Sequence, residues 1–76
     1  MCTVADRELD CQGMSCPMPI VETTKAVRAM ESGQVLVVTA TDLAFKLDIE
    51  AWARRTGHVI EEFHEGDIQR AQIRVS

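Results

Sequence analysis

The sequence lacks any long apolar segment, and its first residues do not follow the pattern of a signal peptide. The longest strongly apolar run is Val35-Leu36-Val37-Val38, far short of the ~20 residues that a membrane-spanning helix needs. The N-terminus becomes acidic at Asp6 and Glu8, where a signal peptide would carry positive charge and then an apolar stretch. We therefore expect a cytoplasmic protein without a membrane-spanning helix.

Basic residues are also scarce, with 8 Lys and Arg against 12 Asp and Glu and a formal net charge of -4. Both halves of the chain share the acidic excess, so there is no basic arm or tail that would bind a phosphate backbone. This charge balance argues against nucleic acid as the main ligand.

Cysteine is limited to 3 residues, and this odd number is not arranged as a disulfide scaffold. A reducing cytoplasm would keep Cys2, Cys11 and Cys16 as thiols. Their possible roles are thiol chemistry, metal ligation or burial. Cys2 lies within residues 1–6, which we expect to form a mobile N-terminus, and we assign it no function.

The 76 residues suffice for one domain only, and 46% of them are hydrophobic, as in globular proteins. The apolar, glycine and proline pattern predicts the order βαβαββ. We expect strands over residues 4–10, 35–40, 58–64 and 68–75, one helix from Pro17 towards Gly33, and another from just after Asp42 to Gly57. Strand–helix–strand units followed by a hairpin give an α+β fold, a two-layer sandwich with a mixed four-stranded sheet and both helices on one face.

Helical spacing also predicts which side chains face the core. In the first helix these are Ile20, Thr23, Val27 and Met30, and in the second Phe45, Ile49, Trp52, Ala53 and Thr56. We expect Trp52 to be a core residue and not a platform for a ligand. Asp42, or Asp48 further along the helix, is expected to cap the second helix.

The segment Cys16-Pro17-Met18-Pro19 carries the clearest chemical signal. Proline is favoured at the first helical position, so we expect Pro17 to begin the helix and Cys16 to be its N-cap. The positive end of the helix dipole would then stabilise a thiolate and lower the pKa of Cys16. Because Pro19 has no N–H, the Met18 N–H is the donor that we expect the sulfur to reach. The segment therefore predicts an exposed, nucleophilic Cys16.

The residues leave two other uses of the cysteines open. Cys11 precedes Cys16 across a loop that contains Gly13, so the two thiols could form a reversible disulfide, although we expect Cys11 to end the first strand, half-buried. A metal site would need these cysteines to meet His58 or His64, but the spacing fits no zinc signature, and we expect no metal. We expect His58 at the rim of the sheet and His64 in solvent.

A partner protein could dock on residues near Cys16. Met14 and Met18 would supply an exposed, adaptable apolar rim. Lys25 and Arg28 lie on the outer face of the first helix. Lys25 is about 13 Å from Cys16 along the helix axis, so we expect it to dock an acidic partner and not to tune the thiol.

These residues belong to a longer pattern that resembles the TusA/SirA family of small sulfur carriers. A Cys-Pro-x-Pro element follows Leu-Asp-x-x-Gly in the run Leu9-Asp10-Cys11-Gln12-Gly13-Met14-Ser15-Cys16-Pro17-Met18-Pro19-Ile20-Val21. The resemblance extends to about Val75 and includes Lys25, Gly33, Asp42, Asp48-Ile49, Trp52 and Gly57-His58.

The resemblance implies a βαβαββ sandwich that carries sulfur as a persulfide on Cys16, supported by Pro17, Met18 and Pro19. It implies a cysteine desulfurase or a rhodanese as donor, and an acceptor protein in tRNA thiolation, molybdenum-cofactor assembly or sulfur oxidation. We expect no cofactor, no direct contact with nucleic acid or membrane, and a monomeric, stoichiometric carrier with little turnover of its own. Cys11 departs from the common pattern, which keeps a Cys11–Cys16 thiol–disulfide switch as an alternative. A regulatory or RNA-binding module is a further alternative.

Overall fold

The structure is a computed structural model that describes residues 5–76. Its elements follow the predicted order: β1 (Arg7–Cys11), α1 (Met18–Arg28), β2 (Val35–Ala40), α2 (Phe45–Thr56), β3 (Val59–His64) and β4 (Gln69–Arg74). Val4, where the first strand was predicted to begin, and Cys2 lie outside the described residues. Neither helix of the described part is long and apolar enough to cross a membrane.

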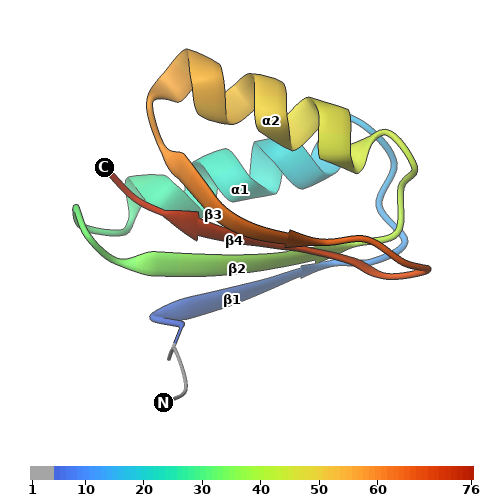
Figure 1. Ribbon diagram of the computed structural model, residues 1–76, viewed down its shortest axis with the longest axis horizontal. Helices are drawn as coiled ribbons and strands as arrows, with labels where there is room; N and C mark the ends of the chain where they lie inside the picture. Colours follow the sequence, from blue (N-terminus) through green and yellow to red (C-terminus); the bar gives the residue numbers. More distant parts are fainter. Residues whose placement is uncertain (1–4) are drawn as a thin grey trace.

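The strands form one mixed sheet in the order β1-β2-β4-β3. β1 is parallel to β2, whereas β4 is antiparallel to both of its neighbours. Figure 1 shows both helices on one side of this sheet, so the predicted two-layer α+β sandwich is confirmed. Because each of the parallel strands is followed by a helix, α1 and α2 both begin where β1 and β2 end, at the right of Figure 1. We call this the carboxyl end of the sheet.

The core lies between the helices and the sheet. On α2 the predicted inward residues Phe45, Ile49, Trp52 and Ala53 are buried, whereas Thr56 is exposed. They pack against apolar side chains of the sheet, which include Leu36, Val38, Ala71 and Ile73. On α1 the predicted residues Thr23 and Val27 are buried, and Ile20 and Met30 are partly buried.

The two helices end in different ways. α1 ends at Arg28, before the predicted Gly33, because the N–H groups of Ala29 and Met30 donate to carbonyls only three residues earlier, each at 3.1 Å, and close a tighter last turn. α2 ends at Gly57 as predicted, with φ at 86° in the left-handed region that glycine adopts without strain.

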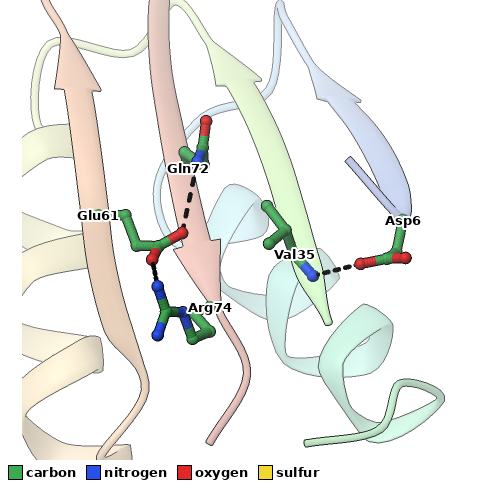
Figure 2. A network of polar contacts seen from close by, with 5 residues as sticks. All are labelled: Asp6, Val35, Glu61, Gln72 and Arg74. Carbon is green, nitrogen blue, oxygen red and sulfur yellow. Dashed lines mark hydrogen bonds and ion pairs between the residues drawn. The ribbon is translucent and has the colours of Figure 1, made fainter. Parts of the chain in front are cut away.

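The face of the sheet opposite the helices carries polar side chains. Figure 2 shows Glu61 of β3 accepting a hydrogen bond from Gln72 and pairing with Arg74, both on β4. The same figure shows the Asp6 carboxylate, which accepts the Val35 N–H at 2.8 Å, while the Asp6 N–H donates to the Val35 carbonyl at 2.9 Å. Asp6 is therefore hydrogen-bonded to the start of β2 through both its backbone and its side chain.

Candidate functional site

Two loops meet at the carboxyl end of the sheet, one between β1 and α1 and the other between β2 and α2. The Gly13 N–H donates to Thr41 Oγ1 at 3.0 Å, and the Cys16 N–H donates to Asp42 Oδ2 at 3.1 Å. The Gln69 side chain, at the start of β4, donates from Nε2 to the Asp42 carbonyl at 2.8 Å. The loop that carries Cys16 is thus held by the second loop, which is itself held by the sheet.

The Cys16 thiol is exposed and makes a hydrogen bond to α2. Its Sγ donates to Oδ2 of Asp48 at 2.8 Å, across 32 residues of sequence. Asp48 lies in the first turn of α2. Together with the hydrogen bond from the Cys16 N–H to Asp42, this contact places the exposed sulfur beside two carboxylates.

These carboxylates raise the pKa of Cys16, and the predicted lowering is wrong. The largest cause is the hydrogen bond to Asp48, followed by desolvation and by the negative charges of Asp48 and Asp42. A thiol donates this hydrogen bond, whereas a thiolate cannot donate it and is repelled by both carboxylates. The prediction considered only the helix dipole, and the acidic side chains that folding brings to the sulfur act in the opposite direction.

The start of α1 also differs from the prediction. The helix begins at Met18 with Pro17 as its N-cap residue, and no side chain caps it. The Met18 N–H donates to the Ser15 carbonyl at 2.8 Å. Because the Met18 N–H already donates to Ser15, the Cys16 sulfur is not the acceptor that was predicted for it. The Cys16 thiol instead donates to Asp48.

The structure separates the two described cysteines. Cys11 ends β1 with its side chain fully buried in the core, beyond the half-burial that was expected, whereas Cys16 is exposed, and both are free thiols. Burial raises the pKa of Cys11, and the negative charges of Glu22 and Asp10 raise it further. Cys11 is therefore a poor nucleophile, and a disulfide with Cys16 would require the core to open.

The residues predicted to support the persulfide divide between surface and core. Met18 is 44% exposed beside Cys16, and Pro17 is also exposed. Pro19 is fully buried and so anchors the first turn of α1. Met14 is partly buried against the core, so it contributes less to an exposed rim than its sequence position suggests.

The basic residues predicted for docking do not meet Cys16. Lys25 and Arg28 lie in the last turn of α1, away from the carboxyl end of the sheet. Lys25 pairs with Glu22, three residues earlier on the same helix, at 3.5 Å. Their role in docking a partner stays a prediction.

Among residues 5–76, one group of three possible metal ligands comes together, formed by Cys16, Asp42 and Asp48 with ligand atoms within 4.8 Å of one another. Neither histidine belongs to it.

The two histidines lie elsewhere. His58 stacks on Trp52 with ring centroids 5.2 Å apart and accepts the Ser76 N–H through Nδ1. His64 is exposed on β3, as predicted.

Sequence reasoning missed the functional position of Asp42 and Asp48. Both were interpreted as helix caps, yet α2 has Ala44 as its N-cap residue, and no side chain caps it. The available signal was topological, because parallel strands that are each followed by a helix bring both helix starts to the same end of the sheet. An acidic residue in the first turn of α2 is thereby placed near a residue that immediately precedes α1.

We expect Asp48→Asn to lower the pKa of Cys16. The substitution removes the negative charge that disfavours the thiolate, so the thiolate fraction at any pH near neutral rises. The rate of Cys16 alkylation by iodoacetamide, followed against pH, should shift to lower pH. Glu50→Gln is the matched control, since it removes one charge from the same helix without touching the thiol. Superimposable profiles for the two variants would show that Asp48 does not control the thiol.

Comparison with known proteins gives the chain its family. The fold and the site define a small α+β protein in which a loop–helix junction presents an accessible thiol. The family model described as sulfurtransferase TusA matches residues 7–75, so the chain belongs to the TusA family. The TusA part of the predicted resemblance is therefore confirmed.

Individual relatives agree with this assignment. The chain is 49% identical to the putative sulfur carrier protein YrkI of Bacillus subtilis, over 91% of this chain and 93% of that protein. It is 47% identical to the sulfur carrier protein TusA of Allochromatium vinosum, over 79% of each. Two further relatives are longer, and the chain spans only 32% and 36% of their lengths. The crystal structure of a SirA-like protein from Desulfitobacterium hafniense has the same fold, with a TM-score of 0.81 at 23% identity over 92% of this chain and 97% of that one.

Proposed function

We propose that this protein is a sulfur carrier that holds sulfane sulfur as a persulfide on Cys16. The observation that carries this proposal is the exposed Cys16 thiol, fixed by two hydrogen bonds where two loops meet. An exposed thiol can reach sulfur on another protein, and a fixed one presents it in a defined direction. The names of the relatives support the same function.

Loading is a thiol exchange in which atoms and electrons balance. Cys16 loses its proton, and Sγ attacks the terminal sulfur of a donor persulfide. A new Sγ–S bond forms while the donor's S–S bond breaks, and the donor leaves as a thiolate that takes up a proton. Delivery is the same exchange with the acceptor thiolate as the attacking group, which returns the Cys16 thiol. Neither step needs an external oxidant or reductant.

A carrier fits this site better than an enzyme with a small-molecule substrate. Cys16 is exposed at a loop–helix junction, and it lines neither of two surface hollows found among residues 5–76. One is formed by α2 and β3, including Ala53, Arg54 and Phe63, and the other lies on the open sheet face near Val35 and Gln72. Small substrates usually bind in concave sites, so we assign the protein a stoichiometric role.

The donor and the acceptor are proteins in this proposal. A cytoplasmic cysteine desulfurase or rhodanese loads Cys16, and the acceptor serves tRNA thiolation, molybdenum-cofactor assembly or sulfur oxidation. No cofactor takes part. Each donor needs an exposed persulfide and each acceptor an exposed thiol, because these groups have to contact the exposed sulfur of Cys16 for sulfur to be transferred.

Mass spectrometry after incubation with a persulfide donor tests the proposal. We expect a gain of about 32 Da for each sulfur atom taken up, assigned to Cys16 by peptide mapping and reversed by an excess of thiol. A loss of two hydrogen atoms (about 2 Da) with a Cys11–Cys16 cross-link, formed when the Cys11 thiolate attacks Sγ of the Cys16 persulfide and releases hydrogen sulfide, would instead support the thiol–disulfide switch. An unchanged mass would overturn the carrier function.

A further inference from the structure

Several large apolar side chains are exposed on the segments that carry Cys16, Asp42 and Asp48. Six large hydrophobic side chains are exposed in residues 5–76, and four of them are close in sequence to Cys16 or to its carboxylate partners. These four, which we call the docking face, are Met18, Val21, Leu43 and Leu47. Leu43 is 93% exposed and Leu47 is 72% exposed. Exposed apolar groups that cluster in this way mark interaction surfaces in soluble proteins.

The two leucines flank the carboxylates that contact Cys16. Leu43 follows Asp42, whose Oδ2 accepts the Cys16 N–H, and Leu47 precedes Asp48, whose Oδ2 accepts the thiol hydrogen. Leu43 lies in the turn just before α2, and Leu47 lies in the first turn of α2. Neighbouring residues of the same segment, such as Phe45, are buried, so the leucines are directed outward while the core is already filled.

The carboxylates of Asp42 and Asp48 lie beside the docking face without a basic partner in the described part of the chain. No ion pair within residues 5–76 includes Asp42 or Asp48. The basic residues of the helix ends, Lys25 and Arg28 on α1 and Arg54 and Arg55 on α2, lie in the last turns, at the opposite end of the helices. Lys46, in the first turn of α2, pairs with Glu65 at 3.1 Å.

Building on the carrier function, we propose that the docking face binds a partner-protein segment that presents a basic and an apolar side chain beside its reactive cysteine. The basic side chain pairs with Asp42 and Asp48, and the apolar one packs on Leu43 and Leu47. A cation between the carboxylates also offsets the negative charge that keeps Cys16 protonated, so the thiol becomes a nucleophile as the partner arrives. A partner with an acidic segment meets repulsion at the same place.

Four short peptides with a cysteine 2-pyridyl disulfide test this without the natural partner. Their sequences are acetyl-Leu-Arg-Cys, acetyl-Ser-Arg-Cys, acetyl-Leu-Glu-Cys and acetyl-Ser-Glu-Cys, each with a C-terminal amide. The Cys16 thiolate attacks the peptide sulfur and forms a mixed disulfide, and the bond to pyridine-2-thiolate breaks. That thiolate takes up a proton to give pyridine-2-thione, whose absorbance reports the rate. Rates are divided by those of 2-mercaptoethanol, an uncharged thiol, to remove the peptides' intrinsic reactivity.

We expect the wild-type protein to react about tenfold faster with the Arg peptides than with the Glu peptides at low salt, and Leu-Arg-Cys to be the fastest. High salt should reduce this ratio, because it screens exposed charges. Asp42→Asn and Asp48→Asn should each reduce the Arg/Glu ratio, whereas Glu50→Gln should leave it unchanged. Leu43→Ser with Leu47→Ser should remove the preference for Leu over Ser and retain the preference for Arg.

Equal or reversed rates for the Arg and Glu peptides would overturn the basic partner, and equal rates for Leu-Arg-Cys and Ser-Arg-Cys would overturn the apolar contact. Either result, obtained with a protein that still gains sulfur on Cys16 in the mass assay, refutes the docking inference and leaves the carrier function standing. Absence of sulfur gain on Cys16 refutes the carrier function whatever the peptide rates.

Discussion

Replacing Cys16 with serine abolishes sulfur uptake, and replacing Cys11 with serine leaves it intact: this is the result we expect from intact-mass measurement with a persulfide donor. A serine hydroxyl does not form a persulfide, so Cys16→Ser loses loading completely. Cys11 is fully buried in the core, where a protein donor cannot reach it. The two variants therefore separate the accessible thiol from the inaccessible one.

The comparison requires that both variants fold. Cys11→Ser buries a hydroxyl among apolar side chains, which costs about 1–3 kcal/mol without a hydrogen-bond partner. Cys11→Ala avoids this cost and serves as a second test, with far-UV circular dichroism reporting the fold of each variant. Sulfur mapped to Cys11 in folded Cys16→Ser, together with loss of sulfur uptake by folded Cys11→Ala, would move the function to Cys11.

The second large effect concerns stability. Trp52 is 2% exposed in the core, and its Nε1–H donates to Thr24 Oγ1 at 3.1 Å, joining α2 to α1. Truncating a buried tryptophan to alanine costs about 3–5 kcal/mol. At about 0.05–0.15 kcal/mol per residue, a chain of 76 residues has only roughly 4–11 kcal/mol of stability. Trp52→Ala should therefore lose much of it.

Urea denaturation followed by circular dichroism measures this effect, since the substitution removes the only tryptophan. Leu47→Ala is the control, because Leu47 is 72% exposed and its truncation should change the free energy of unfolding by less than about 0.5 kcal/mol. Similar denaturation midpoints for the two variants would contradict the core described here.

The raised pKa of Cys16 suits a carrier that must not react indiscriminately. A protonated thiol exchanges slowly with small disulfides and is oxidised slowly, because the thiolate is the reactive form. The empty carrier is therefore protected near neutral pH. Its reactivity rises as the pH approaches the pKa, or when a bound cation offsets the charges of Asp42 and Asp48.

The sequence alone determined the features that depend on neighbouring residues. Apolar periodicity predicted the order of strands and helices and the inward residues of α2 except Thr56, which is exposed. Gly57 marked the end of α2 because glycine readily adopts the left-handed backbone. The prolines around Met18 placed Cys16 at a loop–helix junction, and the thiol is exposed there as predicted. These features follow from local steric and hydrogen-bonding preferences, which act over a few residues.

Only the tertiary structure decided the chemistry of the thiol. β4 lies between β2 and β3, and its Gln69 holds the loop that carries Asp42. The contact between Cys16 and Asp48 spans 32 residues and exists because the parallel pair β1–β2 brings both helix starts to one end of the sheet. Local sequence predicted a lowered pKa from the helix dipole, whereas folding places two carboxylates at the sulfur and raises it. Charge interactions depend on distance in space, and that distance is fixed only when the elements pack.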